Sequence, residues 1–212
     1  MRLVVETCRL RLRFPFRSTH ASVSHMLSEP KQPRLAPLEP PFDSEVSEVL
    51  QRLGPPIALF RVFARRPALA RGVAAWGSYY FSRESALRPR LREMVIHRTA
   101  ASCGADYEWG VHVAYLADKV GFSSEQLRSL AGGMPSDPCW IDPSERAVLR
   151  AVDELYHTHD LSDETWTQLV ATCGEDAALE LLLLSGWYHA ISFVVRAVRL
   201  PLEPGTRPIG AS

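Results

Sequence analysis

Two pairs of acidic and histidine residues, each four positions apart, are the side chains of this sequence best suited to chemistry. In the stretch RLREMVIHRTAASCGADYEWGVHVAYLADKV, Glu93 precedes His97 and Glu108 precedes His112. Residues at i and i+4 share a helix face, so each pair predicts a carboxylate beside an imidazole. An imidazole with a pKa near ~6.5 exchanges protons at neutral pH, and a carboxylate can orient it. The pattern therefore predicts general acid–base chemistry.

These residues need two helices that pack against each other. A short break, Cys103-Gly104-Ala105-Asp106, divides the stretch, so we expect a helical hairpin that brings the four groups together. Asp43-Ser44 predicts the start of a helix that ends near Leu53, and apolar spacing typical of helices recurs along the rest of the chain. Further helices are expected at 57–64, from 67, from 123, from 144, from 162 and from 176. No segment alternates as a strand would, so the predicted fold class is all-α.

The composition of the chain predicts a globular protein and argues against some classes of partner. Hydrophobic residues make up 46% of the 212 and charged residues 23%, as in a soluble globular domain. Lys plus Arg equals Asp plus Glu at 24 each, so we expect neither nucleic acid nor a membrane surface as a partner. The apolar stretch 179–198 is interrupted by polar residues and predicts a buried helix rather than a membrane span.

The cysteines predict a cytoplasmic protein, and the sequence predicts a single domain with a further segment at each end. Cys8, Cys103, Cys139 and Cys173 form no CxxC pair, which is typical of free thiols in a reducing compartment. Residues 1–25 are rich in Arg and Ser, like a transit peptide, although an over-long start is the plainer interpretation. We expect residues 1–40 to be disordered or extended, 41–205 to form the domain, and 206–212 to be a flexible tail.

The stretch LREMVIHRTAASCGADYEWGVHVAYLADKVGFSSEQL resembles the carboxymuconolactone decarboxylase family, which includes alkylhydroperoxidase-like proteins. The resemblance continues through DPSERAVLRAVDELYHTHDLSDETWTQL and YHAISFVVRAVRLPLEP, over roughly residues 40–205. It implies a single-domain helical bundle, a small-molecule substrate and a homo-oligomer, with no cofactor. The family's peroxidase branch carries a CxxC dithiol, and its two cysteine positions correspond to Ala105 and Glu108. The sequence therefore resembles a branch without that dithiol.

The resemblance implies roles for individual residues. Glu93 and His112 correspond to the family's acid and histidine, and we expect them to be catalytic, with Glu108 as a third candidate. The candidates for lining a substrate pocket are Cys103, Tyr107, Trp109, Tyr188 and His189. Packing in the core or at an interface is the simpler interpretation of the aromatic members. His97 is a weaker candidate than Glu108, because a solvent-exposed surface histidine explains it equally well.

Three functions stay open at this point. The first is acid–base decarboxylation of a small lactone or carboxylate by Glu93 and His112. The second is alkylhydroperoxidase or peroxiredoxin-type antioxidant activity that uses Cys103. The third is non-catalytic binding by an oligomer of the same fold. Helical bundles also build metal sites from Glu and His, but the spacing here is not the diagnostic Glu-x-x-His, so no metal is expected.

Overall fold

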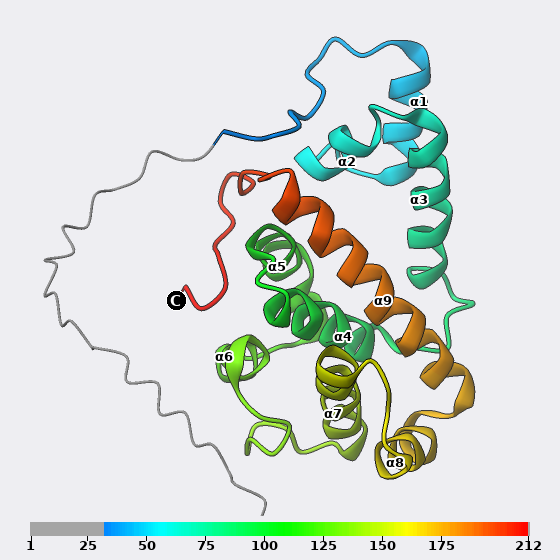
Figure 1. Ribbon diagram of the computed structural model, residues 1–212, viewed down its shortest axis with the longest axis vertical. Coiled ribbons are helices and arrows are strands. Elements are labelled where there is room, and N and C mark those ends of the chain that lie inside the picture. Colours follow the sequence, from blue (N-terminus) through cyan, green and yellow to red (C-terminus); the bar gives the residue numbers. More distant parts are fainter. Residues whose placement is uncertain (1–31, 212) are drawn as a thin grey trace, which may run out of the picture. The chain divides into compact units, whose positions relative to one another are not determined.

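The computed structural model describes residues 32–211. The predictions for residues 1–25, and most of those for 1–40, therefore lie outside the described residues. Every regular element between residues 32 and 211 is helical, which confirms the predicted all-α class. Figure 1 shows how these helices are arranged.

The helices follow one another in chain order. They are α1 (Ser44–Leu53), α2 (Ala58–Phe63), α3 (Pro67–Tyr80), α4 (Pro89–Ser102), α5 (Asp106–His112), α6 (Ser124–Gly132), α7 (Pro143–Thr158), α8 (Asp163–Cys173) and α9 (Glu175–Ala197). Directly after α5 come a π-helical turn, η1 (Val113–Ala117), and a 3₁₀ turn, η2 (Asp118–Val120). The second helix of the predicted hairpin thus changes its winding immediately after His112.

Side-chain caps fix four of the helix starts among the described residues, those of α1, α6, α7 and α8. Asp43 caps α1 by accepting from the Val46 amide, and Ser162 caps α8. Ser123 forms a reciprocal capping box with Gln126 at the start of α6. The helix expected from 144 begins one residue earlier, at Pro143. The cap is Asp142, because Pro at the next position suits the first helical turn, where its missing N–H costs nothing.

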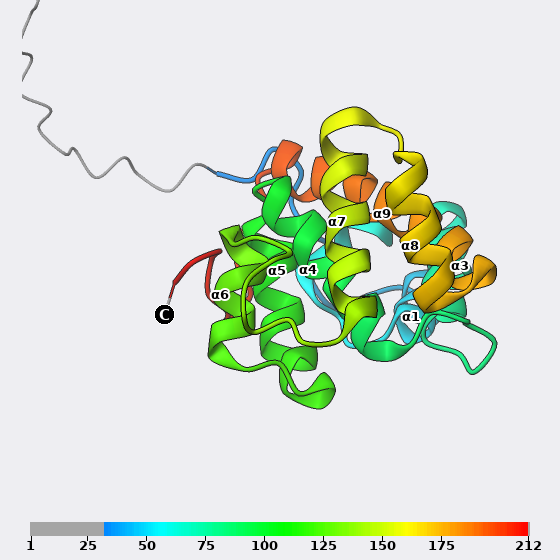
Figure 2. The same cartoon turned by 90° about the horizontal axis from the view of Figure 1, so that it is seen from below.

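Helix α4 lies at the centre of the bundle. It packs against α5, α6, α7 and α9 (Figures 1 and 2). Because neighbours surround it, even its polar residues Arg92, Glu93, His97 and Thr99 are buried. A buried charge is costly unless it is paired, so the partners of these residues decide whether they serve structure or chemistry.

A buried carboxylate on α9 holds the loop that leads into α4. Glu180 accepts hydrogen bonds from the Tyr79 hydroxyl (2.6 Å), the Ser85 hydroxyl (2.6 Å) and the amides of Ala86 (2.8 Å) and Leu87 (3.1 Å). Burial alone would raise the pKa of Glu180, but these donors hold it below its usual range. The entry of the chain into α4 is therefore fixed against α9.

Helix α9 is long and apolar enough to cross a membrane by length and composition alone. Half of its most apolar window is buried in the domain, and its inner side includes Leu181, Leu184, Tyr188 and Ile191. A core helix of a globular domain passes the same test, so we interpret α9 as the predicted core helix.

Candidate functional site

The turn between α4 and α5 positions the candidate acid–base residues. Gly104 adopts a left-handed conformation (φ 62°), which glycine tolerates without strain. The Ala105 amide then donates to the Ala100 carbonyl at 2.8 Å and closes the turn. Helices α4 and α5 pack together as the predicted hairpin. The carboxylate of Glu93 consequently faces the imidazole of His112.

Glu93, Glu108 and Tyr188 surround the His112 ring. Nδ1 of His112 lies 2.8 Å from Oε2 of Glu93. Nε2 lies 3.3 Å from Oε1 of Glu108 and 3.2 Å from the Tyr188 hydroxyl oxygen. Each ring nitrogen therefore has a carboxylate beside it, an arrangement that stabilises the imidazolium form. Of the four predicted groups, the structure brings three into direct contact, and α9 supplies the tyrosine.

Arg92 completes the charges of this cluster. Its Nε donates to Oε1 of Glu93 at 3.2 Å, while its terminal nitrogen donates to the Tyr80 carbonyl at 2.8 Å. The guanidinium also stacks over the Phe81 ring, 4.1 Å from its centroid. The two carboxylates are thus matched by a guanidinium and an imidazolium. Sequence reasoning missed Arg92, because nothing in the pattern marks one arginine among many as buried.

The charges change the proton affinities of the paired groups. Burial alone would lower the pKa of His112, but the Glu93 and Glu108 carboxylates raise it to about 10. Burial alone would raise the pKa of Glu93, but His112 and Arg92 hold it below its usual range. At neutral pH the pair is therefore an imidazolium and a carboxylate, so His112 carries a proton that it can donate.

The interpretation of His97 as a surface histidine is wrong. Its side chain is fully buried, because α4 is surrounded by other helices. Nδ1 donates to the Glu93 backbone carbonyl at 2.7 Å, and the ring meets those of Trp109, His112 and Phe122 edge-on. Burial and the positive charge of His112 lower the pKa of His97 to about 4. His97 is thus neutral near pH 7 and packs against the His112 ring.

The cluster is most open on the side of Glu108 and Tyr188. Glu93 is fully buried, whereas His112 and Glu108 are each 5% exposed and Tyr188 is 8% exposed. Burial and then the nearby carboxylates raise the pKa of Tyr188 well above its ordinary value, so this hydroxyl stays protonated. Oε2 of Glu108 has no hydrogen-bond partner among residues 32–211. Oε2 of Glu108 therefore keeps unused hydrogen-bonding capacity beside His112.

The other candidates lie in different surroundings. The hydroxyl of Tyr107 donates to Glu203 and accepts from the Leu59 amide, so this residue joins α5 to α2 and the C-terminal segment. Trp109 packs against His97. Nδ1 of His189 donates to the Ser185 backbone carbonyl at 3.1 Å, and the ring stacks on Tyr156 of α7. Tyr188 is the pocket candidate that contacts His112.

Cys103 lies at the end of α4 and is nearly buried. Arg196 of α9 donates a short hydrogen bond to its backbone carbonyl. Burial raises the pKa of the Cys103 thiol, although a hydrogen bond with Ser192 and the charge of Arg196 oppose this effect. The thiol is thus protonated at neutral pH and is a poor nucleophile.

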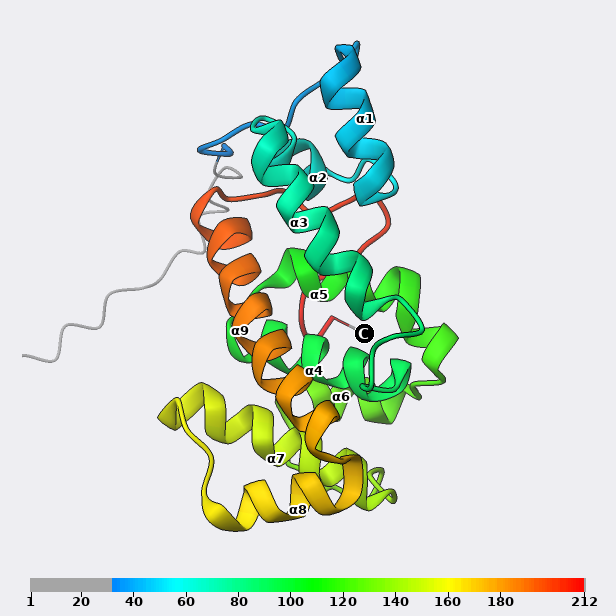
Figure 3. The ribbon, with the colours of Figure 1, turned by 90° about the vertical axis from the view of Figure 1, so that its right-hand side faces the viewer.

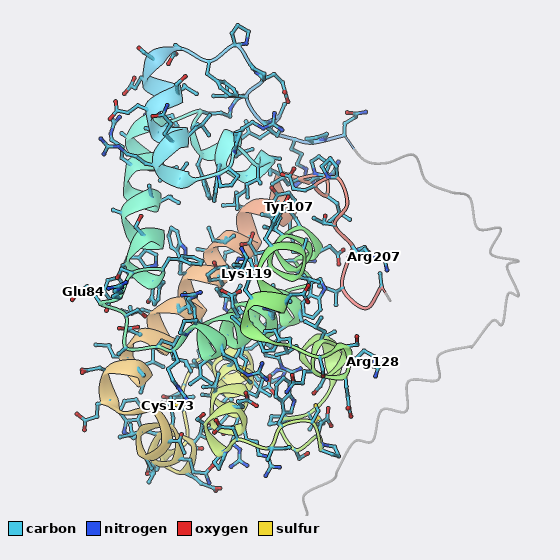
Figure 4. The ribbon with its side chains drawn as sticks, turned by 180° about the vertical axis from the view of Figure 1, so that it is seen from behind. Glu84, Tyr107, Lys119, Arg128, Cys173 and Arg207 are labelled. Atoms are coloured by element: carbon cyan, nitrogen blue, oxygen red, sulfur yellow. The ribbon has the colours of Figure 1, made fainter. Side chains whose placement is uncertain are left out.

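The C-terminal segment packs along the outer side of α5 (Figure 4). The Ile209 amide donates to Asp106 at 3.0 Å. A Cβ at Gly110 would lie 2.8 Å from the Arg207 carbonyl oxygen, so only glycine permits this close approach. Residues 206–211, predicted as a flexible tail, therefore contact the helix that carries Glu108 and His112. No signal in the sequence links Gly110 to the chain end.

The His, Cys, Asp and Glu side chains are the groups that could bind a metal ion. Across residues 32–211, no group of three or more His, Cys, Asp or Glu side chains is arranged to hold a metal ion. The donor atoms of Glu93 and His112 are instead directed at each other. The contact of an imidazole with a carboxylate is suited to acid–base chemistry.

Comparison with known proteins bears on the predicted family resemblance. Residues 67–154 match the model of the carboxymuconolactone decarboxylase family. The predicted family resemblance is confirmed. The matched stretch runs from α3 into α7 and contains Glu93, Glu108 and His112, whereas Tyr188 lies beyond it. No curated protein matches the chain.

Solved structures share the fold of this chain. One is the debrominase Bmp8, as a cysteine-to-alanine variant in complex with 2,3,4-tribromopyrrole, with a TM-score of 0.64 and 16% identity over 80% of this chain and 91% of that one. The apo form of the same debrominase gives a TM-score of 0.63 and 14% identity, covering 80% and 92%. At these identities the likeness shows the fold alone.

Proposed function

We propose that this protein is an acid–base enzyme of the decarboxylase type that acts on a small lactone or related carboxylate. The observation that carries the proposal is the protonated His112 held between Glu93 and Glu108. The match of residues 67–154 to the family model supports an enzyme on this fold, but one fold hosts several chemistries. The proposal therefore depends on the site.

His112 would act as the proton donor. When the carbon–carbon bond to a carboxylate breaks, CO₂ leaves and the bonding electron pair stays on carbon, conjugated to the lactone carbonyl. The proton on Nε2 of His112 passes to that carbon, and the neutral imidazole then regains a proton from water. Nδ1 stays bound to Glu93 throughout, 2.8 Å away, so Glu93 fixes the ring orientation and limits the transfer to Nε2.

Glu108 and Tyr188 would contact the substrate. Both side chains are buried, at 5% and 8% exposed, and the buried Oε2 of Glu108 has no hydrogen-bond partner among residues 32–211. A substrate hydroxyl or amide could donate to this oxygen, and the protonated Tyr188 could donate to a substrate carbonyl. The tribromopyrrole bound by the related debrominase is a small planar ring, which supports a ligand of similar size here.

Turnover of a carboxylated muconolactone, followed by CO₂ release, tests the proposal. Replacement His112→Gln removes the titratable proton, so we expect kcat to fall by about 10²-fold or more. His189→Gln is the matched control, because this second histidine is also bound to a backbone carbonyl but lies against Tyr156. Equal rates for both variants, or no turnover of any lactone carboxylate by the wild type, would refute the proposal.

Sulfur chemistry at Cys103 is the alternative that the same protein preparations can test. A peroxidase needs a thiolate, whereas burial raises the pKa of the Cys103 thiol. We expect Cys103→Ser to leave lactone turnover unchanged. If hydroperoxide reduction with an added thiol were fast in the wild type and lost in Cys103→Ser, the acid–base proposal would give way to the peroxidase.

A further inference from the structure

One side of α9 is apolar and uncovered. Its exposed positions follow one another at spacings of four and three residues: Leu179, Leu183, Gly186, Ala190 and Phe193. We call this set the α9 stripe. Leu179 is 56% exposed, Leu183 48% and Phe193 67%. Apolar residues that repeat every 3.5 residues on average form the contact side of a helix that packs along another helix.

The apolar surface continues onto α3. Figure 3 looks onto α9 with α3 on one side of it. Trp76 of α3 is 37% exposed and contacts Trp187, with ring centroids 5.8 Å apart. The hydrogen bond from Tyr79 to Glu180 fixes α3 beside α9. A contiguous apolar surface over two helices is typical of an interaction site.

We infer that a second copy of this chain covers the α9 stripe, with the two α9 helices antiparallel about a two-fold axis at Gly186. Such an axis places Leu179 opposite the partner's Phe193 and Leu183 opposite the partner's Ala190. Gly186 meets its own equivalent, where the absence of a side chain lets the two backbones approach. The stripe is therefore complementary to itself, as a two-fold interface requires.

The charges at the ends of α9 favour the antiparallel arrangement. Glu175 and Asp176 stand at its start, and Arg196 and Arg199 at or just beyond its end. None of the four makes an ion pair between residues 32 and 211. Antiparallel helices bring each acidic end to a basic end, whereas parallel helices would bring like charges together.

The end of the stripe at Phe193 has room for the partner. Phe193 and Ala197 line a groove of ≈ 1030 Å³, whose other walls include Leu69 of α3 and Phe42 before α1. An antiparallel partner brings the opposite end of its stripe, at Leu179, to this groove. Apolar side chains from the partner would fill an apolar space.

Sedimentation equilibrium of the full chain measures the association. We expect a dimer at micromolar concentration. Leu183→Glu should raise the dissociation constant by about a hundredfold or more, because two-fold symmetry introduces two carboxylates into an apolar contact. Ile141→Glu is the matched control, since Ile141 is 82% exposed in the loop before α7, and it should leave the dissociation constant unchanged. A wild type that stays monomeric would overturn the inference.

Oxidative cross-linking tests the orientation. In the antiparallel arrangement, Gly186→Cys should yield covalent dimers that the wild type lacks. Leu179→Cys should not, because the two copies of that position lie about 21 Å apart along the helices at ~1.5 Å per residue. Cross-linking of Leu179→Cys in place of Gly186→Cys would overturn the antiparallel interface. Binding of the monomer to phosphatidylcholine vesicles, lost in Leu183→Glu, would assign the stripe to a membrane instead.

Discussion

Replacing Glu93 by glutamine should return the His112 pKa towards neutrality. Glutamine keeps the size of the side chain and an oxygen that can accept from Nδ1 of His112, so mainly the charge is lost. At an effective dielectric constant of about 20, unit charges at the observed 2.8 Å interact by about 6 kcal/mol, or about 4 pKa units. Glu93 shares its charge over two oxygens and also pairs with Arg92. We therefore expect about half of this effect.

The expected shift is thus about two units, from a pKa of about 10 in the wild type to about 8 or below in Glu93→Gln. Nitrogen-15 NMR of the histidine rings, recorded as a function of pH, measures it directly. Glu154→Gln is the control, because that carboxylate bonds to Ser162 and Thr165. It should leave the His112 titration where it is.

The same shift has a consequence for stability. The folded pKa of His112 lies above the unfolded value of about 6.5, so its stabilising contribution is complete below pH ~6.5 and is lost as the pH rises through about 10. In Glu93→Gln that loss should occur at lower pH. A wild-type His112 that titrates near 6.5, or one that keeps a pKa near 10 in Glu93→Gln, would show that Glu93 does not hold the proton on His112.

Two further predictions concern the surroundings of the cluster. His97 is buried with a pKa of about 4, below the unfolded value, so the free energy of unfolding should fall by up to about 3 kcal/mol as the pH drops from ~6.5 to about 4. Urea unfolding of His97→Phe should show a weaker dependence of that free energy on pH. The same pH dependence in both proteins would contradict a neutral, buried His97. Gly110→Ala should destabilise the protein in thermal unfolding despite the better helix propensity of alanine, because its Cβ meets the C-terminal segment. Gly77→Ala, which meets nothing within 4 Å, should be neutral or stabilising, and the same sign for both would contradict the contact.

The parts of the fold that sequence predicts are those set by local interactions. Asp43 and Ser162 mark helix starts because their side chains bond amides within the next turn. The break at Gly104 predicts the hairpin because a left-handed residue ends one helix and starts the next. The facing of Glu93 and His112 follows from that hairpin and their positions on it. A short stretch of sequence thus contains the central pair of the site.

The rest depends on contacts between distant segments. His97 has the same spacing from Glu93 that His112 has from Glu108, but burial by surrounding helices cannot be read from spacing. The position of Arg92 depends on its contacts with Tyr80 and Phe81 at the end of α3. The bond from Tyr188 to His112 depends on how α9 crosses the hairpin. The packing of the C-terminal segment on Gly110 joins residues almost a hundred positions apart.

A comparison of two buried carboxylates supports a chemical role for the cluster. Glu180 accepts hydrogen bonds from two hydroxyls and two amides, which is what a structural carboxylate needs. Glu108 meets His112 with one oxygen, while its other oxygen and Nε2 of His97 have no hydrogen-bond partner among residues 32–211. Unsatisfied buried polar atoms and buried ion pairs destabilise a fold relative to apolar packing. Stability alone therefore explains Glu180 but not the cluster around His112, which supports the proposed role of the cluster in proton transfer.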